Sequence, residues 1–260
     1  MTDFRDLHVP GRPLILVNAW DAASARLVAA AGAAAIGTTS AGVAWSLGAP
    51  DGDALPPDGD ALPPAAAVAA VERIVAAVAV PVTADVERGY GDVAETVRRI
   101  SAAGAAGVNI EDGATARPDR IAAARAAAPG LFLNARIDTY LAGAGGLDET
   151  VERATAYLAA GADGIFVPGV TDPATVAALV ARIDAPVNVM AGPGAPPVGE
   201  LAALGVARIS LGSSVAQAAY GLVARAAAAV LGDGGYAELA GAADYGTLNA
   251  LFTPGVPGRG

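Results

Sequence analysis

An acidic segment about a third of the way along the chain carries the residue types that a divalent metal needs. Asp85 and Glu87 stand one residue apart, directly after the apolar run that begins at Pro81, and the turn Gly89-Tyr90-Gly91 follows them. Carboxylates just beyond a strand are well placed to hold Mg²⁺, because this hard cation prefers oxygen ligands and keeps several waters. The segment therefore predicts a magnesium site at the end of a strand.

Two further apolar runs also end in charged residues. Glu111-Asp112 follows residues 107–110, and Arg136-Ile-Asp138 follows residues 131–135. In a parallel barrel the carboxyl ends of the strands meet at one mouth, where such enzymes hold their active sites. A metal at that mouth can stabilise negative charge that develops on a substrate oxygen, and the forked guanidinium of Arg136 can hold a planar carboxylate.

Several catalytic side chains are missing from the chain. It has no Cys and no Lys, so all 16 basic residues are Arg, and its single His is His8, ahead of the first expected strand. Thiolate catalysis, disulfides, cysteine-based zinc sites and lysine Schiff bases are therefore excluded. We expect His8 to be a surface residue, which also argues against a Ser-His-Asp triad. Carboxylates, Arg, hydroxyls, backbone amides and a bound metal remain as chemical tools.

The composition indicates one domain with a large core. The 260 residues are 54% hydrophobic and 16% charged, and their number suits a single α/β barrel over residues 1–260. The net charge of −10 argues against nucleic acid or an anionic membrane as a partner, and makes an anionic substrate depend on local cationic groups. We find no convincing membrane-spanning run and no signal peptide, so we expect a cytoplasmic protein.

Near-continuous apolar runs alternate with helical patterns along the chain. Strands buried on both faces are expected at residues 14–18, 34–38, 82–85, 108–111, 131–136, 164–167, 187–190 and 208–211. Helices are expected at residues 22–31, 65–78, 93–103, 117–128, 148–160 and 173–182, with one further helix in the tail at roughly 236–252. Eight strand–helix units fit a (β/α)₈ TIM barrel. An open doubly wound sheet is the alternative, although no Gly-x-Gly-x-x-Gly follows the first strand.

One segment is an identical tandem repeat of seven residues. Asp-Gly-Asp-Ala-Leu-Pro-Pro occupies residues 51–57 and again residues 58–64, between the second strand and its helix. Two copies of this length cannot build a solenoid. We interpret one copy as a tolerated surface insertion, because lengthening a loop costs little free energy, with a functional lid as the alternative.

Taken together, these segments resemble the isocitrate lyase/phosphoenolpyruvate mutase family. The most specific part is Asp85-x-Glu87-x-Gly-Tyr-Gly, followed in order by Glu111-Asp112 and Ala-Arg136-x-Asp138. The resemblance runs from about Leu16 to Gly212, and its other pieces are LVNAWD at 16–21, TTSAG at 38–42, LG at 47–48 with Asp51, AAGAD at 159–163 and PVNV at 186–189. It implies a (β/α)₈ barrel, with the last helix often exchanged between subunits, and therefore a homodimer or homotetramer.

The resemblance also implies roles for individual residues and Mg²⁺ as the cofactor. Asp85 would be the metal carboxylate, while Glu87 and Glu111 would hold metal-bound waters. Arg136 would grip the substrate carboxylate or stabilise an enolate oxygen. Other substrate contacts implied by the resemblance come from Thr39, Ser40 and Ala41, which would bind the substrate carboxylate, from Asn188 on the opposite wall, and from Asp51, which would close over the site from its loop.

Structural roles remain open as alternatives for several of these residues. Asp85 and Glu87 could form salt bridges with Arg88 or Arg136. Asp112, or Glu111 beside it, could cap the helix that follows them. Asp138 is expected to orient Arg136, and Tyr90 to pack against its loop rather than act as an acid.

The sequence also departs from the resembled family where specificity is decided. The segment after Glu111-Asp112 is Gly113-Ala-Thr-Ala-Arg-Pro118, which lacks the Cys of the isocitrate-type lyases and the polar loop of the mutase. We expect a Mg²⁺-dependent lyase that cleaves a C–C bond in a small 2-oxo or 2-hydroxy carboxylate through a metal-stabilised enolate. The alternatives are a mutase for phosphoenolpyruvate or phosphonopyruvate, a hydrolase for an acid like oxaloacetate, and a barrel without turnover that acts as a binding protein.

Overall fold

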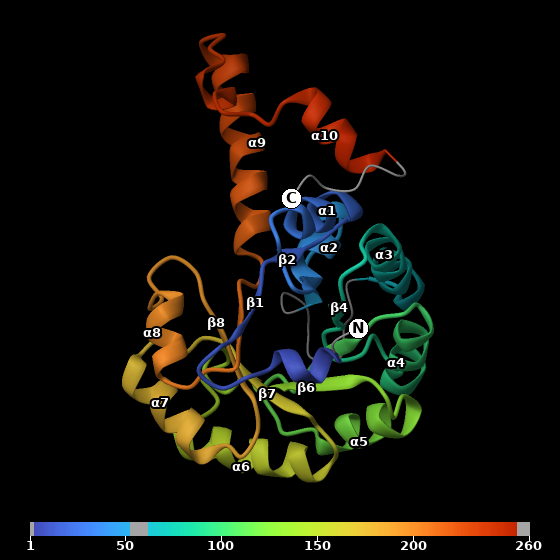
Figure 1. Ribbon diagram of the computed structural model, residues 1–260, viewed down its shortest axis with the longest axis vertical. Helices are drawn as coiled ribbons and strands as arrows, with labels where there is room; N and C mark the ends of the chain where they lie inside the picture. Colours follow the sequence, from blue (N-terminus) through green and yellow to red (C-terminus); the bar gives the residue numbers. More distant parts are fainter. Residues whose placement is uncertain (1–2, 53–61, 254–260) are drawn as a thin grey trace.

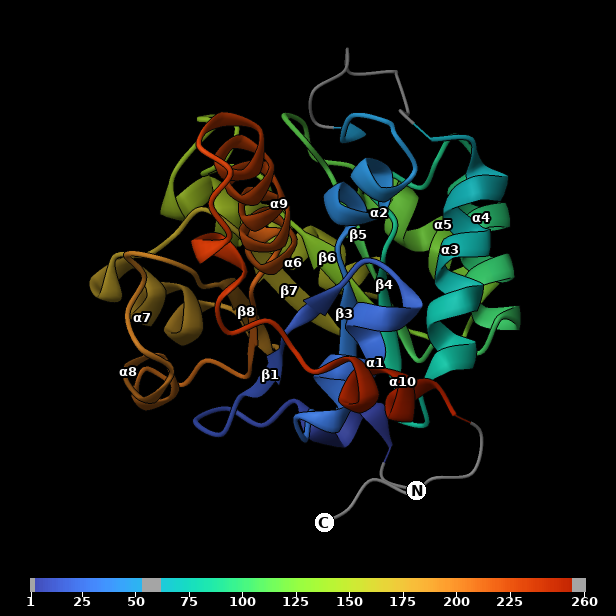
Figure 2. The same ribbon diagram turned by 90° about the horizontal axis from the view of Figure 1, so that it is seen from above.

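The parallel strands of the protein form a nearly closed barrel. The computed structural model describes residues 3–52 and 62–253. Within that part, neighbouring strands pair in the order β1-β9-β8-β7-β6-β5-β4-β3-β2 (Figures 1 and 2). The strands are β1 (Leu14–Leu16), β2 (Asn18–Ala19), β3 (Ile36–Thr38), β4 (Val82–Asp85), β5 (Gly107–Glu111), β6 (Phe132–Arg136), β7 (Gly164–Val167), β8 (Val187–Met190) and β9 (Arg208–Ser210). The predicted (β/α)₈ barrel is confirmed.

The first predicted strand is divided into two short strands. β1 pairs with β9 from Leu14 to Leu16, whereas β2 pairs with β3 from Asn18 to Ala19. The predicted range 14–18 therefore spans both sides of the seam at which the barrel closes. This division explains why an eight-unit barrel has nine named strands.

Helices lie outside the barrel, and most of them connect successive strands, whereas the last two follow β9. They are α1 (Ala22–Ala30), α2 (Ser40–Ser46), α3 (Pro64–Ala77), α4 (Val93–Ala102), α5 (Pro118–Ala127), α6 (Leu147–Ala159), α7 (Pro173–Arg182), α8 (Val198–Ala203), α9 (Ser214–Gly232) and α10 (Tyr245–Phe252), with 3₁₀ turns η1 (Phe4–Leu7) and η3 (Ala237–Leu239). The predicted barrel helices agree within a single residue at either end. Local capping accounts for several starts: the Asp92 carboxylate accepts the N–H groups of Ala94 and Glu95 at α4, for example.

The tail carries one further α-helix, as predicted, but this helix occupies only the second half of residues 236–252. The 3₁₀ turn η3 ends at Leu239, Gly241 takes a left-handed φ of 83°, and Asp244 caps α10. Ahead of this tail, α9 rises away from the barrel body (Figure 1). Among the described residues α9 is long and apolar enough to cross a membrane by length and composition alone, and 6% of its apolar window is buried. One such helix is weak evidence for a membrane span, and this one carries Arg225 within it.

His8 is another correction, since it is buried rather than on the surface. Its ring stacks on Phe132 with 4.1 Å between centroids, and Nδ1 lies 3.0 Å from the Phe4 carbonyl oxygen, to which it donates. Burial, reinforced by the positive charge of Arg208, lowers the pKa of His8 to about 4. His8 is therefore neutral at pH 7 and lies at the amino-terminal end of the barrel, away from the predicted catalytic mouth.

Most of the tandem repeat lies outside the described residues. The first copy contributes Asp51 and Gly52 to the described part, and the second copy contributes Leu62, Pro63 and Pro64. Leu62 is buried in the main core beside α3, and Pro64 is the first residue of that helix. The prediction that one copy is a surface insertion therefore stays a prediction.

Candidate active site

A small cavity lies at the carboxyl ends of the barrel strands. It has a volume of about 140 Å³, well below the 300–1,000 Å³ of pockets for drug-sized ligands, so it suits a small acid. Its lining residues are Asn18, Thr39, Ser40, Ala41, Asp51, Asp85, Asn109, Arg136, Leu141, Phe166, Pro168, Met190, Ser210, Gly212 and Ser213. Six of the predicted site residues therefore share one cavity: Thr39, Ser40, Ala41, Asp51, Asp85 and Arg136.

Strand register explains why Asp85 and Arg136 meet. Asp85 is paired in register with Asn109, and Glu111 is paired with Arg136, so the ends of β4, β5 and β6 carry their polar side chains side by side. The Asp85 N–H donates to Thr38 Oγ1 at 2.8 Å, which ties the end of β4 to the end of β3. Ser40 Oγ lies 3.5 Å from Asp85 Oδ2 at the start of α2. The cavity is thus built on strand ends rather than on loops alone.

Arg136 is held in place by two buried carboxylates. Its Nη1 lies 2.7 Å from Glu111 Oε2, and its Nε donates to Asp138 Oδ1 at 2.7 Å. Arg88 Nε approaches the other oxygen of Glu111 at 3.5 Å. Glu111 and Asp138 are almost fully buried, and Arg136 is only 8% exposed. The guanidinium is therefore preorganised at the cavity wall, and the prediction that Asp138 orients Arg136 agrees with this contact.

Glu87 lies in a strained turn beneath the loop that carries Asp51. Glu87 and Tyr90 both have left-handed backbones, with φ of 50° and 49°, in the part of φ/ψ space that costs most residues energy. A methyl group on Gly52 would overlap Glu87 Oε2 and lie 2.8 Å from its Cδ, so the loop backbone rests directly on this carboxylate. Burial, together with the charges of Glu87 and Asp85, raises the pKa of Tyr90 well above its ordinary value. Tyr90 therefore stays protonated, as expected for a residue that packs against its loop.

Asp112 does not cap the following helix, which corrects that alternative. The N-cap of α5 is Arg117, and the Asp112 carboxylate points elsewhere. Its Oδ1 accepts the N–H of Asp138 at 3.0 Å, while its Oδ2 accepts from Arg153 at 3.0 Å and from Tyr157 at 2.7 Å. Asp112 thus fixes the backbone just beyond Arg136 and ties it to α6.

Asn188 does not line the cavity. Its side chain lies in the barrel interior, where Nδ2 donates to the carbonyl oxygens of Val189 and Arg208 and to Ser210 Oγ. Glu87 and Glu111 are likewise behind the cavity wall rather than on it. The predicted substrate contact of Asn188 stays a prediction. The same holds for the predicted role of Glu87 and Glu111 in holding metal-bound waters.

Several lining residues were not identified from the sequence. In the sequence, Phe166, Met190 and Leu141 have the pattern of ordinary apolar positions. Ser210 lies at the end of an expected strand, and Ser213 lies in the turn after it. Asn109 stood inside the Asn-Ile-Glu-Asp motif without a role. The available signal was its position two residues before Glu111, because alternate strand residues point to the same face of a sheet.

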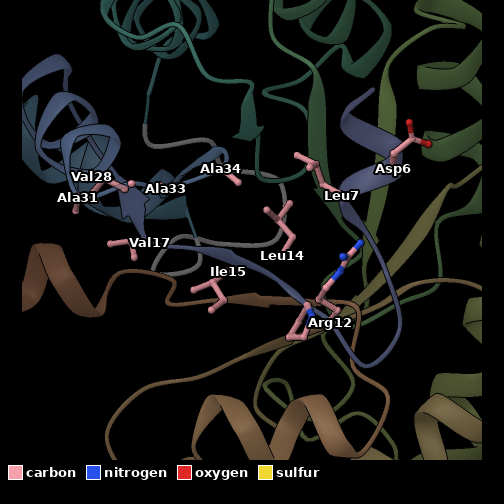
Figure 3. A pocket seen from close by; sticks show the side chains of 12 residues that line it. Asp6, Leu7, Arg12, Leu14, Ile15, Val17, Val28, Ala31, Ala33 and Ala34 are labelled. Atoms are coloured by element: carbon pink, nitrogen blue, oxygen red, sulfur yellow. The ribbon is translucent and has the colours of Figure 1, made fainter. Parts of the chain in front are cut away.

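A larger cavity lies elsewhere, outside β1. It has a volume of about 550 Å³ and is lined mainly by apolar side chains of β1 and α1, with Asp6 and Arg12 at one end (Figure 3). Leu14, Ile15, Val17 and Val28 form much of its wall. The described residues that line it form no cluster of convergent polar groups of the kind that orient a substrate. The smaller cavity at the strand ends is therefore the better candidate for chemistry.

The residues at the smaller cavity fit Mg²⁺ by donor type. Within the described residues no group of three or more His, Cys, Asp or Glu side chains is close enough to hold a metal directly. Mg²⁺ does not need such a cage, because it keeps several waters and is commonly held through one or two carboxylates. Asp85 on the wall, with the buried oxygens of Glu87 and Glu111 behind it, is a donor set of that kind.

Comparison with known proteins identifies the family to which this barrel belongs. The profile of the family described as phosphoenolpyruvate phosphomutase matches residues 4–231. The chain belongs to the phosphoenolpyruvate mutase family. An uncharacterized protein of Mycobacterium tuberculosis (strain H37Rv) is 40% identical over 239 residues, covering 87% of this chain and 88% of the other. An oxaloacetate decarboxylase of Rhodopseudomonas palustris (strain TIE-1) is 37% identical over 147 residues, 49% of each chain.

Solved structures of this family superpose closely on the barrel. A provisionally assigned lyase/mutase from Burkholderia cenocepacia J2315 has a TM-score of 0.86 and 42% identity, covering 97% of this chain and 95% of the other. A phosphonopyruvate hydrolase, in complex with oxalate and Mg²⁺, has a TM-score of 0.80 and 26% identity, covering 97% and 95%. The family therefore places the chain among lyases and mutases that act on small carboxylates.

Proposed function

We propose that this protein is a Mg²⁺-dependent lyase that cleaves a C–C bond in a small 2-oxo carboxylate, with oxaloacetate as the first substrate to test. The observation that carries the proposal is the cavity of about 140 Å³ in which Arg136, Asp85 and Asp51 meet. A buried guanidinium facing a metal-type carboxylate can bind an anionic acid that a chain of net charge −10 would otherwise repel.

Each residue of the cavity has a proposed task. Arg136, fixed by Glu111 and Asp138, holds the negative charge of the substrate. Thr39, Ser40 and Ala41 hold a carboxylate on the opposite side, and Asp51 closes the cavity from its loop. Asp85 would hold Mg²⁺, assisted by waters on Glu87 and Glu111. Once bound, Mg²⁺ would supply stabilisation of negative charge on a substrate oxygen.

The chemistry available in the cavity favours a decarboxylation. The described residues that line it include no His, Cys, Lys or Tyr, so the side chains there that could act as a base on a hydroxyl proton are the carboxylates of Asp51 and Asp85, which already have other proposed tasks. Loss of CO₂ from oxaloacetate needs no such base. The bond between C3 and the C4 carboxyl carbon breaks, its electron pair remains on the three-carbon fragment, and C3 then takes a proton to give pyruvate. Preorganised charge, as on Arg136, is usually the largest catalytic contribution in reactions of this kind.

We further propose that the protein is a cytoplasmic homodimer, or a homotetramer built from two such dimers, in which α9 packs against a second copy. α9 and the tail expose large apolar side chains, including Val223 at 64% and Leu231 at 87%. Contiguous exposed apolar surface is typical of an interface. The apolar cavity beside β1 is a surface that the α9 of a second copy could cover, because the chain's own α9 points away from it (Figures 1 and 3). Light scattering coupled to size exclusion measures the assembly.

The proposed reaction is tested by ¹³C NMR of labelled oxaloacetate with and without Mg²⁺. Pyruvate and CO₂ indicate decarboxylation, whereas oxalate and acetate indicate hydrolysis; phosphonopyruvate in parallel tests the mutase alternative. A protein-free Mg²⁺ sample corrects for spontaneous decay. Asp85→Ala is expected to abolish both turnover and calorimetric Mg²⁺ binding, while Asp172→Ala, at the exposed start of α7, leaves both unchanged. Mg²⁺ binding without turnover of any acid would support the binding-protein alternative instead.

A further inference from the structure

A positively charged side chain lies buried beneath the candidate active site. Arg208 is 1% exposed and projects into the barrel interior from β9, two residues before the cavity residue Ser210. Its Nη2 donates to Asn109 Oδ1 at 3.0 Å, but its Nε and Nη1 have no hydrogen-bond partner among the described residues. Burial lowers the pKa of Arg208 to about 9, against the opposing effect of the Asp85 charge, so the side chain stays charged at pH 7.

The contact with Arg208 determines which way the Asn109 amide faces. A guanidinium carries only donors and no acceptor, so the Asn109 atom opposite Arg208 must be the carbonyl oxygen. The amide nitrogen then lies on the other side of the group. Because Asn109 lines the cavity, and its Nδ2 makes no hydrogen bond to any other described residue, this nitrogen is available to the cavity.

A second chain of contacts imposes the same orientation independently. Asn188 Nδ2 faces the carbonyl oxygens of Val189 and Arg208, which accept only, so Asn188 Oδ1 must face Asn134. Asn134 Nδ2 therefore donates to Asn188 Oδ1 at 3.1 Å and to Asn109 Oδ1 at 3.0 Å. Arg208 and Asn134 thus both donate to the oxygen of Asn109. If the Asn109 amide were flipped, its NH₂ group would face both donors and neither would have an acceptor.

The geometry points to Asn109 as a further substrate-binding residue, one that donates its amide N–H to an oxygen of the bound acid, and to Arg208 as the positioning residue that fixes it. This inference rests on the proposed function for the class of ligand, a small carboxylate, but not for the reaction. It gives the cavity a neutral donor on the floor, beside Arg136 on the wall. It also gives a reason for the buried Arg208, whose Nε and Nη1 groups lack hydrogen-bond partners among the described residues and would otherwise only destabilise the folded protein.

The inference is tested by calorimetric binding of oxalate in the presence of Mg²⁺, with thermal unfolding measured on the same samples. Asn109→Ala is expected to lower oxalate affinity roughly tenfold to a hundredfold, the effect of one hydrogen bond to a charged group. Arg208→Met leaves Asn134 on the Asn109 oxygen and is expected to lower the affinity less, roughly twofold to tenfold. The double variant is expected to lose no more than Asn109→Ala alone, because Arg208 acts through Asn109. Arg208→Lys keeps an N–H donor of similar reach and is expected to restore most of the affinity.

Stability separates this role from a purely structural one. Arg208→Met removes a buried charge with unmet donors, so its melting temperature is expected to stay the same or rise while affinity falls. Arg125→Met is the control, because Arg125 bonds to Leu131, Gly161 and Asp163 at the opposite end of the strands; it should lose stability and keep oxalate affinity.

Three outcomes would overturn the inference: wild-type affinity in Arg208→Met, additive losses in the double variant, or no oxalate binding by the unaltered protein. Turnover of oxaloacetate is recorded separately. Binding that follows the expected pattern without any turnover would refute the proposed lyase reaction and leave the assignment of Asn109 and Arg208 supported.

Discussion

Replacing Arg136 by Gln should damage activity and stability together, and the two losses can be calculated separately. Arg136 lines the cavity and also pairs with Glu111 and Asp138, each at 2.7 Å. Loss of its charge toward the substrate is expected to lower kcat/KM by roughly two to three powers of ten, about 3–4 kcal/mol of transition-state stabilisation. Breaking a buried ion pair on one side usually costs about 3–5 kcal/mol.

The stability loss should fall at the lower end of that range. Glu111 keeps Arg88 at 3.5 Å, and the Gln amide can still donate one hydrogen bond, so about 3 kcal/mol is a reasonable expectation. For a chain of this size that corresponds to a fall of roughly 6–12 °C in melting temperature. Arg136→Lys keeps a charge without the fork and should recover part of the stability but little of the activity.

The assay combines thermal unfolding with Mg²⁺-dependent turnover of oxaloacetate, measured well below the melting temperature of the weakest variant. Arg125→Gln is the matched control, since it breaks the pair with Asp163 at the opposite end of the barrel and should lower stability without changing kcat/KM. Full activity in Arg136→Gln, accompanied by a large loss of stability, would refute the functional assignment. Arg136 would then be only the structural partner of Glu111 and Asp138.

Three further predictions concern other parts of the chain. Gly52→Ala should lower kcat/KM roughly tenfold to a hundredfold with little change in melting temperature, because the added methyl overlaps Glu87 and displaces Asp51; unchanged kinetics would contradict this. His8 has a folded pKa of about 4, below its ordinary 6.5, so its contribution to stability is complete above pH 6.5 and is lost as the pH falls toward 4. The loss should reach about 3 kcal/mol and be absent in His8→Phe, as denaturant titrations across that pH range can show. Deletion of residues 58–64 should leave the melting temperature nearly unchanged, since doubling a loop costs only about 0.6 kcal/mol; a fall of many degrees would mean that both copies pack against the barrel.

The strands and helices of the barrel were predictable because their signals are local. β4, β7 and β8 begin and end where the apolar runs do, and Pro173–Arg182 forms a helix from its Asp172 cap onward. The helix in the tail was also predictable, but its start was not. Gly241 takes a left-handed φ, and Asp244 caps the helix that begins at Tyr245.

The site was predictable only in part. Residues at strand ends can be assigned to the mouth of the barrel, but the sequence does not tell whether their side chains face the cavity or lie in the layer below it. Asp85 and Arg136 could be placed from their position at the ends of apolar runs. Asn188 occupies a similar position in its segment, yet it points into the barrel and serves Ser210 and Asn134. Whether a residue at a strand end faces the cavity or the layer below depends on the stagger between strands, which a single sequence does not reveal.

The chain has Arg and no Lys, and this choice allows positive charge to be kept inside the barrel. Burial disfavours the charged form of a basic group, and a buried Lys commonly loses its proton near neutral pH. Arg208, although fully enclosed, has a pKa of only about 9 after that penalty and therefore keeps its charge. An Arg-only chain can thus hold fixed positive charges both on the cavity wall, at Arg136, and beneath the cavity floor, at Arg208. These two charges face the carboxylates of Asp85, Glu111 and Asp138, so a chain of net charge −10 still presents a cavity that an anionic acid can enter.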